Sequence, residues 1–160
     1  MQTPAVNDSP STNRLTPAEL AAWRGMLRAH ADLVTGLDAE LRTAHELSLH
    51  EYEVLLILDN APEQRLRMSD LAAAVVLSQS GLTRLVDRLV LAGAVERTRC
   101  ETDRRGLNAE LTAVGRARLA EARPTHLAGV RSRFVDRFDE RELGLLADFW
   151  ERVLPGATSE

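Results

Sequence analysis

Hydrophobic residues recur with helical spacing through residues 16–47 and form one stripe that a single long helix would present on one side. The repeating apolar positions are Leu20, Leu27, Val34 and Leu41. Before them, Thr16 is suited to cap a helix, Pro17 to occupy its first position, and Glu19 to complete a capping box. A helix of this length in a small protein cannot bury its whole stripe within one lobe. We therefore expect part of it to contact a second subunit.

Shorter helices are predicted in the middle of the chain. Ser48 and Glu51 have the spacing of a second capping box, and the helix that they open cannot continue past Pro62. Ser69 is predicted to open another helix over residues 70–76.

The next predicted helix has two different sides. Ser78 follows a tight turn and is suited to cap a helix that ends near Ala92, where Gly93 supplies the left-handed residue. One side is apolar and is made by Leu82, Leu85, Val86 and Leu89. The other side is polar and is made by Gln79, Ser80, Thr83, Arg84, Asp87 and Arg88. Small polar residues at the start of a helix suit the major groove of DNA.

A β-hairpin is predicted over residues 94–100 and 107–111. In its second strand the apolar Leu107, Ala109 and Leu111 alternate with Asn108 and Glu110, which is typical of a half-buried strand. The tip of the hairpin carries Asp103, Arg104 and Arg105. An arginine-tipped hairpin beside a polar helix is typical of a winged helix-turn-helix that binds duplex DNA.

The C-terminal part of the chain is predicted to be helical again. Thr112 caps a long helix that we expect to bend or break near Pro124 and to resume through Phe134. Asp139 and Glu142 form a third capping box. The last helix is expected to bury an apolar set composed of Leu143, Leu146, Phe149, Trp150 and Val153.

The predicted fold class is mostly α with a small β-hairpin wing, a winged helix-turn-helix with long N- and C-terminal dimerisation helices. Residues 1–15 are rich in Pro, Ser, Thr and Asn without apolar periodicity and are expected to be disordered. The other predicted divisions are an N-terminal dimerisation helix (16–47), a DNA-binding lobe (48–112) and C-terminal dimerisation helices (113–160).

The composition supports packed helices and a cytoplasmic location. Of the 160 residues, 44% are hydrophobic but only 4% are aromatic, which disfavours a sandwich or barrel. No apolar run has the length of a membrane span, and no secretory signal is visible. A lone cysteine, Cys100, excludes an intrachain disulfide and agrees with a reducing compartment.

Charge is distributed unevenly. The net charge is −4, yet the segment from Arg65 to Arg105 holds eight arginines against five acidic residues, a local balance of +3. Every basic residue in the chain is arginine, whose planar fork can bind phosphate or guanine through two bonds. The acidic total therefore does not exclude a nucleic-acid partner.

The stretch SDLAAAVVLSQSGLTRLVDRLVLAG, followed by VERTRCETDRRG and a glycine at Gly115, resembles the MarR family of winged-helix transcriptional regulators. The hairpin Asp-x-Arg, here Asp103 and Arg105, carries the most specific part of the resemblance. It implies a homodimer that places one helix of each protomer in the major groove and one wing in the adjoining minor groove. It also implies a repressor of a near-palindromic operator, released by a small aromatic effector.

The resemblance assigns the DNA-facing side of the polar helix to Ser78, Gln79, Ser80, Thr83, Arg84 and Arg88. We expect Gln79 to contact a base edge, and Arg84 and Arg88 to bind phosphate. Arg105 is expected to enter the minor groove and Arg104 to contact phosphate, with Asp103 supporting Arg105 through a charge-assisted bond.

Simpler interpretations stand beside these assignments. The charged positions of the polar helix could form a solvated face, Ser78 could act as a cap alone, and Asp103 could be a turn residue. Trp23 and His30, with Tyr52, are candidates for an aromatic-ligand pocket, although core or dimer packing is the more common role of such residues.

Other chemistry has little support in the sequence. Cys100 has arginines nearby but no second cysteine to resolve an oxidised form. The four histidines, His30, His45, His50 and His126, show no metal-binding spacing. No nucleophile motif, phosphate loop or cofactor signature is present, so we expect neither an enzyme nor a cofactor. The alternative function is a helical protein–protein adaptor that has the winged-helix fold but does not bind DNA.

Overall fold

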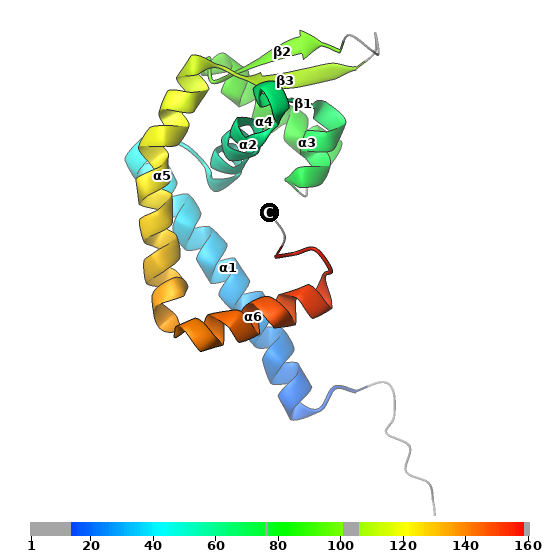
Figure 1. The fold of residues 1–160 in the computed structure, drawn as a ribbon, viewed down its shortest axis with the longest axis vertical. Helices are drawn as coiled ribbons and strands as arrows, with labels where there is room; N and C mark the ends of the chain where they lie inside the picture. Colours follow the sequence, from blue (N-terminus) through cyan, green and yellow to red (C-terminus); the bar gives the residue numbers. More distant parts are fainter. Residues whose placement is uncertain (1–13, 76, 101–105, 159–160) are drawn as a thin grey trace, which may run out of the picture. The chain divides into compact units, whose positions relative to one another are not determined.

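The computed structural model describes residues 14–75, 77–100 and 106–158 (Figure 1). By its internal contacts the chain divides into two units, residues 1–32 and 33–160. The predicted disordered tail and the wing tip therefore fall largely outside the described residues.

The first unit contains the beginning of α1 (Pro17–His45). The amide of Thr16 donates to Glu19 Oε2 at 2.7 Å, and the amide of Glu19 donates to Thr16 Oγ1 at 3.3 Å. These reciprocal bonds confirm the predicted capping box, and they fix where the long helix begins.

The second unit holds the end of α1 and the remaining elements, which are joined by short connections. They are α2 (Leu49–Asn60), η1 (Pro62–Gln64), β1 (Arg65–Arg67), α3 (Met68–Ala74), α4 (Gln79–Leu91), β2 (Val95–Arg99), β3 (Leu107–Leu111), α5 (Ala113–Arg133), η2 (Val135–Arg137) and α6 (Glu140–Val153). The mostly helical fold with a small antiparallel wing confirms the predicted fold class.

The sheet has three strands rather than the two of the predicted hairpin. Its order is β1–β3–β2, with both pairs antiparallel, and Ala109 lies between Leu66 and Arg97. The predicted alternation in β3 is wrong at its start, because Leu107 is 46% exposed whereas Asn108 is buried. Asn108 has a cross-strand neighbour on each side, Arg67 of β1 and Thr98 of β2.

The core of the second unit is almost entirely aliphatic. Leu41 of α1 and Leu119 of α5 are buried with side chains from the helices between them. Its largest fully buried members from those intervening elements are Leu47, Leu55, Leu58, Leu71, Leu82, Leu89, Val54, Val86 and Val95. Burial of apolar surface contributes about 25 cal/mol per Å², so this cluster supplies the main stabilisation of the lobe.

Two other expectations about the helices need correction. α3 begins at Met68 after Arg67, and Ser69 lies inside the helix with its hydroxyl donating to Asp70 Oδ1, so Ser69 is not the cap. α5 runs without a break through Pro124. Contacts on both sides of the proline hold α5 in place, since Arg118 Nη2 donates to the His45 carbonyl oxygen before it and Thr125 Oγ1 lies 2.8 Å from His45 Nε2 after it.

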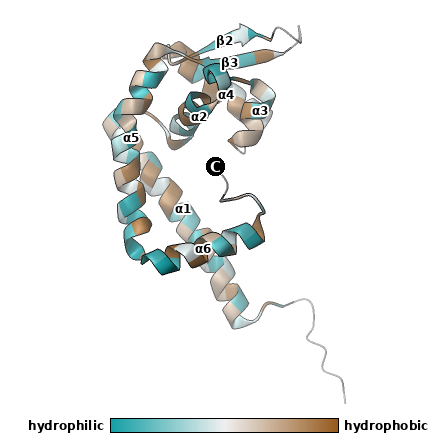
Figure 2. Ribbon diagram, in the orientation of Figure 1, coloured by the Kyte–Doolittle hydropathy of each residue, from teal (hydrophilic) through white to brown (hydrophobic). Residues whose placement is uncertain are grey.

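The apolar side of α6 is not buried in the single chain. Figure 2 shows hydrophobic and hydrophilic residues mixed along this helix, and no residue of α6 is classed as buried. Phe149 is 43% exposed and Val153 is 73% exposed, so the single chain by itself does not bury this set. The capping box of Asp139 and Glu142 is confirmed, so the helix itself begins as predicted.

Candidate nucleic-acid interface

The helix α4 presents a polar side because its apolar side is fixed in the core. Leu82 and Leu89 are fully buried, whereas Ser80, Thr83 and Arg84 are exposed. These exposed positions lie opposite the buried stripe in helical geometry. Gln79 is the first residue of α4, and its side chain lies outside what the structure describes.

Both ends of α4 are fixed by local bonds. Ser78 is the N-cap, and its Oγ accepts from the amide of Gly81 at 3.1 Å, as predicted. At the other end Gly93 has a φ of 68°, and the amide of Ala94 donates to the Leu89 carbonyl oxygen. A left-handed glycine closes the helix and sends the chain directly into β2.

An ion pair joins the wing to α4. Arg97 of β2 donates from Nη1 to Asp87 Oδ1 at 2.5 Å and from Nη2 to the Thr83 carbonyl oxygen at 3.3 Å. No local pattern in the sequence indicates this contact, because only the fold sets the angle between the hairpin and the helix. The predicted tip residues Asp103, Arg104 and Arg105 lie outside the described residues.

The base of the wing is packed tightly against α5. Thr112 caps α5 through the Gly115 amide, as predicted, and its hydroxyl also donates to the Gly93 carbonyl oxygen at 2.7 Å. A Cβ added at Gly115 would lie 2.1 Å from the Ala94 carbonyl oxygen. A glycine is therefore required where α5 passes the start of β2.

Arg88 is engaged within the protein as well as being exposed. Its Nε donates to Glu51 Oε1 of α2 at 2.8 Å, and its side chain is 56% exposed. Burial alone would raise the pKa of Glu51, but bonds from Ser48 and Arg88 outweigh it and the net pKa is lowered. Glu51 is therefore ionised at neutral pH.

The three candidate ligand residues are not gathered in a described pocket. Tyr52 is 2% exposed and its ring centroid lies 4.4 Å from that of His126, so it is a core residue in this chain. Burial raises the pKa of the Tyr52 hydroxyl, with Arg123 opposing the shift. Trp23 and His30 belong to the first unit, and the grouping of all three remains a prediction.

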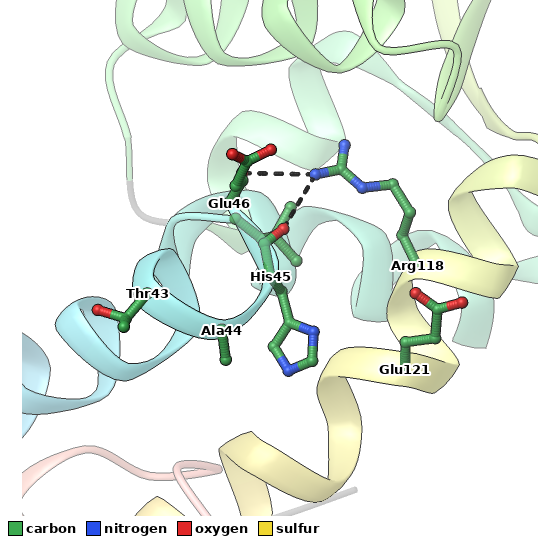
Figure 3. Close-up of a pocket in the computed structure, with 7 residues that line it drawn as sticks. Thr43, Ala44, His45, Glu46, Arg118 and Glu121 are labelled. Atoms are coloured by element: carbon green, nitrogen blue, oxygen red, sulfur yellow. Dashed lines mark hydrogen bonds between the residues drawn. The ribbon is translucent and has the colours of Figure 1, made fainter.

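Two pockets lie within the second unit, and no pattern in the sequence indicates either of them. One, of about 440 Å³, is lined by the end of α1 and by α5 (Figure 3). In it Arg118 Nη2 donates to the carbonyl oxygens of His45 at 3.5 Å and Glu46 at 3.4 Å. The other, of about 570 Å³, is lined in part by Glu51 and Arg88.

The remaining candidates from the sequence are Cys100 and a metal site. Cys100 is partly exposed, and its amide closes the described end of the hairpin by donating to the Gly106 carbonyl oxygen at 3.0 Å. Among residues 14–75, 77–100 and 106–158, no three His, Cys, Asp or Glu side chains are grouped as metal ligands would be. No helix in these ranges has the length and apolarity needed to cross a membrane.

A capped polar helix with a bonded three-stranded wing defines a winged helix-turn-helix protein. The family model described as the MarR family matches residues 45–106. The chain is 36% identical to AbsC, a MarR family transcriptional regulator from Streptomyces coelicolor, with a TM-score of 0.83 over 89% of this chain and 95% of that one. It therefore belongs to the MarR family of transcriptional regulators, which confirms the resemblance found in the sequence.

Two further relatives extend this comparison. Sco3205, a MarR family regulator from the same organism solved in complex with DNA, is 32% identical, with a TM-score of 0.85 over 95% of this chain and 94% of that one. The transcriptional repressor YetL from Bacillus subtilis is 30% identical over 110 residues, which are 67% of this chain and 66% of YetL. The chain thus spans about two thirds of the length of YetL.

Proposed function

We propose that this protein is a sequence-specific DNA-binding regulator that acts as a homodimeric repressor on a near-palindromic operator. The observation that carries the proposal is the exposed polar side of α4, capped by Ser78 and bonded to the wing through Arg97 and Asp87. Sco3205, which is 32% identical and was solved in complex with DNA, supports DNA as the partner.

The residue assignments from the sequence are retained as part of the proposal. Gln79 contacts a base edge, and Arg84 and Arg88 bind phosphate. The remaining contacts are assigned to Ser78, Ser80, Thr83, Arg104 and Arg105, with Asp103 supporting Arg105. Ser80, Thr83 and Arg84 are exposed on α4, as this role requires.

A second copy of the chain is proposed to cover the apolar side of α6. Leu145, Phe149 and Trp150 are each more than a third exposed, and exposed apolar surface of this kind is typical of a subunit interface. A two-fold axis would then place the two α4 helices about one helical turn of DNA, ~10 bp, apart. Release by a small aromatic effector near Trp23, His30 and Tyr52 completes the proposal.

The test is direct binding of the full-length protein to duplexes recovered by selection from a random-sequence library. We expect one family of near-palindromic sequences. We also expect the logarithm of the affinity to fall linearly with the logarithm of the salt concentration, because phosphate contacts release counterions. A salt-independent affinity would contradict the phosphate contacts. A stable dimer that retains no duplex at all would instead support the adaptor function.

A further inference from the structure

Glu51 of α2 contacts two parts of the lobe at once. Its Oε2 accepts from the amide and the hydroxyl of Ser48, each at 2.8 Å, which closes the capping box of α2. Its Oε1 accepts from Arg88 Nε of α4 at 2.8 Å. The Glu51 side chain is only 12% exposed. The carboxylate is therefore held in one place by the helix that it caps.

The arginine on the other side of this contact keeps most of its binding capacity. Among the contacts of the described residues, Arg88 donates through Nε alone, and its side chain is 56% exposed. The two Nη groups form the fork that binds a phosphate through two bonds. Arg88 follows Arg84 by one helical turn, so the two guanidinium groups are neighbours along α4.

We propose that Glu51 is a positioning residue for DNA binding, which orients the guanidinium of Arg88 so that its two Nη groups contact a backbone phosphate. The inference rests on the proposed function, since it assigns a supporting residue to the same surface. Glu51 does not touch DNA in this arrangement. It lowers the conformational entropy that Arg88 loses on binding, because one edge of the guanidinium is already fixed before the duplex arrives.

The two functions of Glu51 can be separated by a single substitution. In Glu51→Gln the amide oxygen can still accept from Ser48, so the capping bond to α2 is kept. The amide nitrogen is then left facing Arg88 Nε, and two donors cannot bond to each other. The substitution therefore removes the contact with Arg88 and keeps the cap.

The experiment is a double-mutant cycle measured on the full-length protein with a fluorescein-labelled duplex recovered by the selection described above. We expect Arg88→Ala to weaken binding about tenfold and Glu51→Gln about fivefold. In the double variant we expect no more than the loss caused by Arg88→Ala alone. Loss of one phosphate contact should also reduce the slope of log affinity against log salt by about 0.9 in Arg88→Ala, with a reduction in the same direction in Glu51→Gln.

Glu53→Gln is the matched control, because it removes the same charge two residues further along α2 from a carboxylate that is bonded to His50. We expect it to leave affinity unchanged or slightly stronger, because removing a negative charge from the protein does not weaken its attraction to DNA. If Glu51→Gln behaves like this control, or weakens binding equally when Arg88 is already alanine, the positioning role is wrong. If the wild-type protein binds no duplex, the proposed function fails and this inference fails with it.

Discussion

The guanidinium of Arg97 on β2 lies against the carboxylate of Asp87 on α4, with Nη1 and Oδ1 2.5 Å apart. The Arg97 side chain is 27% exposed, and its Nε is buried without a hydrogen-bond partner among the described residues. Asp87 therefore provides the main compensation for a cation that is partly removed from water. The contact fixes the wing relative to the helix that we assign to the major groove.

Asp87→Ala should loosen this connection between the wing and α4. Asp87 is 49% exposed, so we expect the free energy of unfolding to fall by only about 0.5–1 kcal/mol. The larger effect should be faster amide hydrogen exchange in β2, measured by mass spectrometry. Glu96→Ala is the control, since it removes an exposed carboxylate from the same strand. Equal exchange in both variants would show that the ion pair does not hold the wing.

Gly115→Ala should be strongly destabilising. The added methyl group would meet the Ala94 carbonyl oxygen at 2.1 Å and Leu111 Cδ1 at 2.7 Å, so the backbone at Ala94 or α5 would have to move. We expect a loss of about 2–3 kcal/mol in the free energy of unfolding by urea denaturation. Gly144→Ala on α6 is the matched control, because no atom lies within 4 Å of its added Cβ. That variant should gain about 0.5–1 kcal/mol from helix propensity, and a similar loss in both variants would refute the packing argument.

His126 should make the protein less stable in acid. Burial against Tyr52 lowers its pKa in the folded chain below the usual 6.5, with Glu53 opposing the shift. The unfolded chain then takes up a proton more readily than the folded one, so the free energy of unfolding decreases as the pH falls below about 6.5. Urea denaturation at about pH 7.5 and about pH 5.5 should show a smaller decrease for His126→Phe than for the wild type. An identical decrease in both proteins would exclude His126 as the cause.

Local chemistry made the helix starts predictable from the sequence. Ser48 and Asp139 lie three residues before a glutamate, and their capping boxes depend only on neighbouring backbone amides. Gly93 adopts the left-handed conformation because a glycine has no Cβ, which is also a local property. The positions of α2, α4 and α6 therefore follow from short segments of sequence.

Contacts between distant segments were not predictable in this way. β1 has three residues and forms only because β3 pairs with it, so it leaves no pattern of its own. The bonds of Asp87 with Arg97 and of Glu51 with Arg88 depend on how the wing and α2 pack against α4. The continuity of α5 through Pro124 depends on its contacts with α1, which offset the one lost backbone bond.

Phe149→Glu on α6 should convert a dimer into a monomer. Phe149 is 43% exposed, so a charge there is tolerated in the single chain but would be costly in an apolar subunit interface. Sedimentation velocity should show the change in mass, while circular dichroism should show that the helices are retained. Gly144→Glu adds the same charge to the opposite side of α6 and should remain dimeric. A wild type that sediments as a monomer would contradict the proposed assembly.

Gln79 and Arg84 should differ in how they affect DNA binding. Replacing Gln79 with alanine removes the amide that we assign to a base edge, so affinity for the selected operator should fall by about 1–3 kcal/mol. Affinity for unrelated duplexes should stay nearly the same, and the preference at one base pair should be relaxed. Arg84→Ala should instead weaken binding to all duplexes and reduce the salt slope by about one, because a phosphate contact carries no sequence information. Both effects can be measured by fluorescence anisotropy with the selected operator, single-base variants of it and a random duplex at several salt concentrations. If Arg84→Ala alters base preference while Gln79→Ala lowers every affinity equally, the two assignments must be exchanged.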